Sequence, residues 1–119
     1  PMNDAAPPFR SQHGEDILCW KMFHDSPGPR FFVEVGIIDG VRFSNTLALE
    51  QRGWRGLCVE AHPEYAALAV SNRPGSRVMH AAASDRSGGT ITFYADPRGD
   101  LSSVVDRGEE EMRSRFGKW

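Results

Sequence analysis

A short apolar run that ends in an acid and a glycine constrains this chain more than any other feature. The run is FFVEVGIIDG, residues 31–40. Its aromatic and β-branched residues are typical of a fully buried parallel strand. Gly36 allows the backbone to turn sharply after the strand, and Gly40 allows it to pass close to a ligand. The run therefore predicts the first strand of a nucleotide-binding unit, followed by a glycine turn.

The spacing of the glycines indicates which cofactor such a turn would accept. The dinucleotide fingerprint Gly-x-Gly-x-x-Gly has its second glycine where this chain has Ile38. Bulk at this position disfavours a pyrophosphate packed on the turn, and with it nicotinamide-dependent oxidoreduction. Glu34, an acid two residues before the first glycine, fits S-adenosylmethionine enzymes, where a carboxylate faces the cationic methionyl end of the cofactor. The alternative is an ordinary strand-turn-helix unit without a ligand.

Composition limits the classes of partner. The chain has 119 residues, enough for one domain, and a net charge of -2, which offers no electrostatic footprint for nucleic acid or an anionic membrane. No apolar run reaches the roughly 18 residues of a membrane span, and the first 30 residues show no signal-peptide pattern. Cys19 and Cys58 lie in apolar surroundings and resemble buried thiols. We therefore expect a cytoplasmic protein with no nucleic-acid or membrane partner.

Helical and strand-like segments alternate around the first strand. Three helices are predicted. The first lies within residues 11–26, with Ser11 as N-cap and apolar residues that cover the core, and the second spans residues 46–52, capped by Ser44 or Asn45 and ended by Gly53. The third begins at Pro63 and ends at residues 74–75. Further buried strands are predicted over residues 56–60 and 77–83. This alternation indicates an α/β fold with a parallel sheet.

The remaining segments have other compositions. Residues 1–10 are rich in proline and predict a flexible arm, and residues 105–119 predict a polar tail or short helix. Residues 90–95 are β-branched and aromatic, and their connection to the preceding strand is too short for a crossover, so they predict an antiparallel strand at the sheet edge. Residues 11–104 are accordingly assigned to one Rossmann-like half-domain.

Polar groups follow the second and third predicted strands. Glu60 ends the second strand, where parallel α/β sheets place an acid that accepts hydrogen bonds from both ribose hydroxyls. A solvated loop acid is the alternative. After the third strand, small residues lead to Ser84 and Asp85, which would let an adenine ring lie flat and meet a polar group at its edge. Small residues also simply pack well, so this second assignment stays open.

Six motifs in a fixed order carry a family resemblance. They are SQHGED at 11–16, FFVEVGIIDG at 31–40, SNT at 44–46, GWRGLCVEAHPE at 53–64, NRP at 72–74 and AAASD at 81–85. With these motifs the chain resembles the FkbM-type S-adenosylmethionine-dependent methyltransferases over residues 11 to about 104. The resemblance implies a Rossmann-like class I methyltransferase fold and O-methyl transfer to a small-molecule or sugar hydroxyl.

The resemblance also implies a cofactor site for S-adenosylmethionine. Its residues would be Glu34, Gly36, Asp39 and Gly40 in the cofactor loop, Ser44 or Asn45 at the methionyl carboxylate, Glu60 at the ribose, Ala83 and Ser84 beside the adenine, and Gln12 closing over the cofactor. The catalytic residue stays unassigned, because a general base would be one of four scattered histidines or lie outside the matched segment. The histidines show no metal-ligand spacing, so we expect no metal.

Two departures from the family pattern matter. Ile37 stands where the family usually has alanine, which would narrow the methionyl pocket. Residues 96–119 hold nothing like the next family motif, LKIDVEGxE, so we expect a fold truncated after the third parallel strand, without its substrate half. The first strand would then be an open apolar edge, and such edges pair with other chains. We therefore expect a homo-oligomer formed through residues 31–35, or a piece of a longer enzyme.

These departures leave a second function open. The chain would then be a truncated, non-catalytic Rossmann-like module that folds by oligomerisation and does not turn over a substrate.

Overall fold

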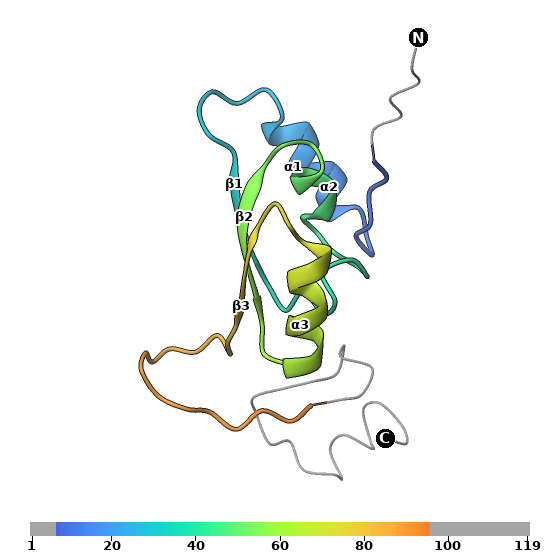
Figure 1. The fold of residues 1–119 in the computed structure, drawn as a ribbon. Coiled ribbons are helices and arrows are strands. Elements are labelled where there is room, and N and C mark those ends of the chain that lie inside the picture. The colour runs from blue at the N-terminus through green and yellow to red at the C-terminus, as the bar shows by residue number, and fades with distance from the viewer. Residues whose placement is uncertain (1–6, 96–119) are drawn as a thin grey trace.

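The structure, a computed structural model, describes residues 7–95. Its elements are α1 (Glu15–Phe23), β1 (Phe31–Val35), α2 (Leu47–Glu50), β2 (Arg55–Glu60), α3 (Pro63–Asn72) and β3 (Arg77–His80). The strands form one parallel sheet in the order β1-β2-β3, and the helices lie on one side of it (Figure 1). The predicted α/β class and parallel sheet are thus confirmed for this part of the chain.

The strand register places the core between the sheet and the helices. Phe32 pairs with Gly56 and Glu34 with Cys58, and all four residues are buried. A Cβ atom built on Gly56 would lie 2.1 Å from the Phe32 ring, so β2 needs glycine where the ring crosses it. Burial raises the pKa of the Cys58 thiol, which keeps this core cysteine uncharged.

The opposite face of β1 is uncovered. Phe31, Val33 and Val35 alternate with the buried residues of the strand and are 62%, 60% and 59% exposed. Within residues 7–95, β2 is the only strand paired with β1. The predicted open apolar edge is therefore confirmed for the described residues. The expectation of a fully buried strand is wrong, because both crossover helices pack on the other face of the sheet.

The start of α1 differs from the prediction. Gly14, with φ 86°, is the N-cap residue, whereas Ser11 was expected in that position. Several apolar side chains of this helix face solvent rather than the core: Ile17, Leu18, Met22 and Phe23 are 38%, 59%, 59% and 46% exposed. The expectation that apolar residues of this helix cover the core is wrong for these four, whereas Cys19 and Trp20 do pack against the core cluster. The helix packs mainly on α2 and not on the strands.

Ser11 nevertheless stabilises the first turn of α1 through hydrogen bonds to Asp16 and Gly14. The Ser11 hydroxyl donates to Asp16 Oδ1 at 2.5 Å and accepts the Gly14 N–H at 3.0 Å, and Asp16 Oδ2 accepts the Arg10 N–H at 2.7 Å. Burial raises the pKa of Asp16, but hydrogen bonds from the Ser11 hydroxyl and from the backbone N–H groups of Arg10, Ser11 and Ile17 outweigh it. The pKa of this carboxyl therefore lies below its usual range.

The second helix is shorter than predicted. α2 begins after Thr46 instead of Ser44 or Asn45, and its C-cap is Gln51. The N–H groups of Arg52 and Gly53 bond to carbonyl oxygens only three residues back, at 3.0 and 2.9 Å, which tightens the last turn. Gly53 then reverses the chain with φ 94°, as the sequence predicts for the residue that ends this helix.

Residues 7–10, assigned to the predicted flexible arm, contact the folded unit. Arg52 Nη2 donates to the Pro7 carbonyl oxygen at 2.7 Å, and the Arg52 guanidinium lies 4.3 Å from the centroid of the Phe9 ring. These contacts attach this part of the arm to the turn after α2. The rest of the arm and the predicted tail at 105–119 lie outside the described residues.

The segment after α3 differs most from the prediction. β3 ends at His80 and not at residue 83. Residues 90–95 form no strand, and among them only Tyr94 makes a β-bridge. Ile91 and Tyr94 are 47% and 41% exposed. The predicted antiparallel edge strand is wrong, because strand propensity reflects packing on a half-buried surface, which this segment does not have.

Gly56→Ala tests the packing of Phe32 across β2. The added methyl group overlaps the ring, which has to shift within a close-packed core, so we expect the free energy of unfolding to fall by about 1–3 kcal/mol. Urea unfolding followed by circular dichroism measures the change. Gly89→Ala is the control, because a Cβ there meets no atom within 4 Å. Equal stabilities of the two variants would contradict the packing.

Asp16→Asn tests the anchor of α1. Because the folded-state pKa of Asp16 is lowered, its contribution to stability is complete above the unfolded pKa of about 3.9 and is lost as the pH falls through the folded value. We expect the parent to be more stable than Asp16→Asn at neutral pH, with a gap that shrinks below about pH 4. Unfolding free energies measured across this range check it; a constant gap would contradict the assignment.

Candidate cofactor-binding site

A cavity of about 560 Å³ lies at the carboxyl ends of the strands. Its lining follows the strands in turn: Glu34 to Ile38 at β1, Val59 to Ala61 at β2, and Ala81 to Ala83 after β3, completed by Gln12, Arg42, Phe43, Asn45 and Phe93. Open α/β sheets bind ligands outside the carboxyl ends of their strands. The volume is within the range of about 300–1,000 Å³ that is usual for small-molecule sites.

The cavity brings together most of the predicted cofactor residues. Those that line it are Gln12, Glu34, Gly36, Asn45, Glu60 and Ala83. Asp39, Gly40, Ser44 and Ser84 lie in neighbouring loops and do not line it. Asp39 Oδ1 accepts the N–H groups of Val41 and Arg42, each at 2.9 Å, and so shapes its own turn. Ser84 is exposed, and its hydroxyl lies 3.3 Å from Asp85 Oδ1.

Glu60 connects the end of β2 to the turn after β1. Its Oε2 accepts the Ile38 N–H at 2.7 Å, and its Oε1 accepts the His62 N–H at 2.8 Å. The residue is 6% exposed and borders the cavity. Each carboxylate oxygen has two lone pairs, so Glu60 retains the capacity to accept hydrogen bonds from a ligand.

The turn that Glu60 holds is strained. Ile38 has φ 54°, in the left-handed region, where a β-branched residue is an outlier. Such a backbone costs of the order of 1–3 kcal/mol and persists only when its surroundings hold it in place. The hydrogen bond to Glu60 is one such restraint. The sequence pattern predicted the bulk of the Ile38 side chain but not its glycine-like backbone conformation.

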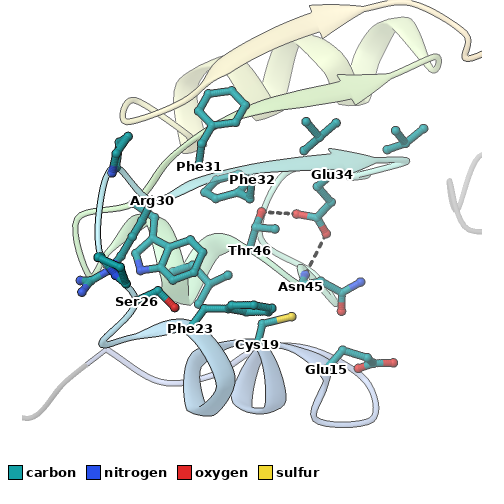
Figure 2. Close-up of a pocket in the computed structure, with 16 residues that line it drawn as sticks. Glu15, Cys19, Phe23, Ser26, Arg30, Phe31, Phe32, Glu34, Asn45 and Thr46 are labelled. Atoms are coloured by element: carbon teal, nitrogen blue, oxygen red, sulfur yellow. Dashed lines mark hydrogen bonds between the residues drawn. The ribbon is translucent and has the colours of Figure 1, made fainter.

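The Glu34 carboxylate accepts hydrogen bonds from other residues of the protein. Its Oε1 accepts the Asn45 N–H at 2.8 Å, and its Oε2 accepts the Thr46 hydroxyl (Figure 2). The same Oε2 also accepts the Ser44 hydroxyl at 3.0 Å. The residue is 8% exposed. Its carboxylate therefore ties β1 to the loop before α2, a role that the sequence pattern did not indicate.

Arg73 was not among the predicted site residues. It is fully buried at the end of α3. Its Nε donates to Glu50 Oε2 at 2.7 Å, and its Nη1 lies 3.6 Å from Glu34 Oε2. The guanidinium also donates to the hydroxyls of Ser44 and Thr46 at 3.2 and 2.8 Å. One cation thus joins β1, α2 and the loop between them.

The turn at residues 39–40 is shaped around the same side chain. Gly40 has φ 84°, and a Cβ there would lie 2.7 Å from Arg73 Cγ. Arg73 Nη1 donates to the Gly40 carbonyl at 3.3 Å, and Asn72 Nδ2 donates to the Asp39 carbonyl at 2.9 Å. The sequence signal for this role is the NRP motif at 72–74, which is part of the family resemblance.

None of the four histidines lines the cavity. His13, His24 and His80 are exposed, whereas His62 is buried with its ring 4.6 Å from that of Tyr65. The first of the two alternatives for a general base, one of the histidines, is therefore not found at this site, and the second, a residue outside the matched segment, stays a prediction. In the part of the chain that the structure describes, no group of three or more His, Cys, Asp or Glu side chains is placed to hold a metal ion.

A scan against protein-family models, a search of curated proteins and a search of solved structures found no match to this chain. Its function is therefore inferred from the cavity and from the motifs that line it. Over residues 7–95, no helix is long and apolar enough to cross a membrane.

Arg73→Gln tests the buried ion network. The substitution removes the cation and leaves Glu34 and Glu50 buried without their partner, so we expect a loss of about 3–5 kcal/mol in the free energy of unfolding. Chemical denaturation measures it. Arg77→Gln, at an exposed position on β3, is the matched control and should change stability by less than about 0.5 kcal/mol. Similar losses in both variants would show that the network contributes nothing.

Proposed function

We propose that the cavity binds S-adenosylmethionine and that this chain is the cofactor-binding part of a methyltransferase. Glu60 carries the proposal: its carboxylate borders the cavity at the end of β2, next to the turn after β1. An acid in this place accepts hydrogen bonds from the two hydroxyls of a ribose. The motif order that resembles the FkbM-type enzymes favours S-adenosylmethionine over other nucleosides.

The other lining residues suit the remaining parts of that cofactor. The side chains of Ala81, Ala82 and Ala83 are small enough for an adenine ring to lie against them. At the β1 end, Gly36 leaves room beside the backbone, and Gln12 and Asn45 offer exposed amides to a methionyl group. Both amides can donate to a carboxylate.

The proposed reaction is O-methyl transfer to a small-molecule or sugar hydroxyl. Bound S-adenosylmethionine would supply an electrophilic methyl group on its sulfonium. The residues of this chain would contribute by positioning, which lowers the barrier by fixing the reacting atoms in line. A new C–O bond would form as the C–S bond breaks, and the hydroxyl proton would pass to a general base. None of the four histidines is placed for this role, because none of them lines the cavity.

A second function, a non-catalytic module, is favoured by the hydrogen bonding of the two acids. Glu34 and Glu60 both accept hydrogen bonds from groups of the protein itself, so neither acid depends on a ligand for a hydrogen-bond partner. In that case the motifs would serve the fold, and S-adenosylmethionine would bind weakly or not at all.

Calorimetric titration distinguishes the two functions. We expect saturable binding of S-adenosylmethionine and S-adenosylhomocysteine and none of NAD. Glu60→Ala should weaken binding at least about tenfold, because hydrogen bonds to a charged group contribute about 1.5–3 kcal/mol. Glu64→Ala removes the same charge from an exposed site on α3 and should leave binding unchanged. Circular dichroism confirms that each variant is folded.

Two outcomes would contradict the proposal. One is a folded parent chain that binds neither methionyl ligand. The other is equal affinity in the parent and in Glu60→Ala, which would remove the residue on which the proposal depends.

A further inference from the structure

A second concave surface lies along the open side of β1. This edge groove, of about 590 Å³, runs between α1 and β1 and continues over the loop that joins them (Figure 2). Its apolar lining comes from separate parts of the chain: Cys19 and Phe23 of α1, Phe32 of β1, Leu49 of α2 and Trp54 before β2. The groove is thus a long apolar surface bordered on one side by a strand edge.

The backbone of β1 presents free hydrogen-bonding groups to the edge groove. The Gly36 N–H bonds to the Val59 carbonyl, and the Arg55 N–H bonds to the Arg30 carbonyl. Successive residues of a strand direct their backbone N–H and carbonyl groups to opposite sides. The groups of the even-numbered residues of β1 therefore bond to β2, and the groups of residues 31, 33 and 35 point to the open side. Within residues 7–95, no strand pairs with them.

Two buried donors in the same groove are also unsatisfied. Trp54 Nε1 and Arg30 Nε have no hydrogen-bond partner among the described residues, and Trp54 is only 7% exposed. Most buried donors in native proteins are paired, so each exception requires an explanation. Both atoms are already shielded from solvent by the protein itself, so they mark an incompletely satisfied wall of the groove. The free strand edge is the feature with which a further polypeptide segment would pair.

We propose that this segment is β1 of a second copy of the chain, paired antiparallel about a twofold axis at Val33. Phe31 then faces Val35 of the second copy, and the free backbone groups of both strands bond to each other. Each copy contributes a strand and a groove, as an isologous interface requires. An axis at Glu34 would place two carboxylates directly opposite each other, which is unfavourable.

The charges at the two ends of the groove support the antiparallel direction. Figure 2 shows Arg30 at the start of β1 and Glu15 below its end, near Asn45. An axis at Val33 brings Arg30 of one copy to the end where the other copy carries Glu15. A parallel arrangement would place like charges together at each end.

Val33→Pro is the first test. Proline removes an N–H that points to the open side and leaves the ladder to β2 intact, as is usual for proline on an edge strand. Light scattering should show a dimer for the parent and a monomer for Val33→Pro, with unchanged circular dichroism. Val33→Thr keeps both the shape and the N–H and should remain a dimer. Hydrogen exchange should be slow at residues 31, 33 and 35 in the parent. In Val33→Pro, which has no amide hydrogen at residue 33, exchange should be fast at residues 31 and 35.

A charge exchange tests the orientation and does not depend on proline. Arg30→Glu and Glu15→Arg should each weaken the dimer about tenfold, and the double variant should recover it, which a loss of folding alone would not produce. Met79→Lys, on the uncovered face but on β3, should have no effect.

Three results would overturn the proposal. A parent chain that stays monomeric up to its solubility limit would exclude the pairing. A double variant without recovery would exclude the antiparallel direction. Dissociation by Met79→Lys but not by Val33→Pro would show that copies associate through the sheet face instead.

Discussion

The buried guanidinium of Arg73 is the interaction on which the rest of the structure depends. It lies between Glu34 of β1 and Glu50 of α2, so three elements share one charge network. Burying a charge is costly unless it is paired and hydrogen-bonded, and here every partner comes from a different part of the chain. The same side chain packs against Gly40 and so fixes the turn after β1. The turn beside the cavity is therefore held by an ion network in which Glu34 lines the cavity and Arg73 does not.

The exposed surfaces follow from the direction of the crossovers. Connections between neighbouring parallel strands are right-handed, so α2 and α3 lie on the same face when the strands follow the order β1-β2-β3. The other face and the outer side of β1 are left uncovered within the described residues. Glu34 and Asn45 line both the cavity and the edge groove. The cavity and the groove thus share a wall, and a strand bound at the edge would contact residues that border the cavity.

Local patterns predicted β1, β2 and the start of α3 well, because their signals depend only on residues close in sequence. These signals are runs of β-branched residues for the strands and Pro63 for the helix. Glu60 was placed by a rule of sheet topology, and it does border the cavity. The roles of Arg73 and Glu34 were not predictable, since their partners are 10 to 39 residues away in the chain. Residues 90–95 have the composition of a strand, but composition does not predict whether the fold provides a surface on which the segment can pack.

Glu34 and Glu60, the two acids at the strand ends, differ in their remaining capacity to accept hydrogen bonds from a ligand. Glu34 accepts hydrogen bonds from Ser44, Asn45 and Thr46 and lies within ion-pair distance of Arg73, so its carboxylate is almost fully used. Glu60 accepts two backbone N–H groups and has no basic partner among the described residues. Lone pairs therefore remain at Glu60, beside a turn held in a strained conformation. A ligand that used them would also add a restraint on Ile38, so binding and the stability of the turn are physically linked.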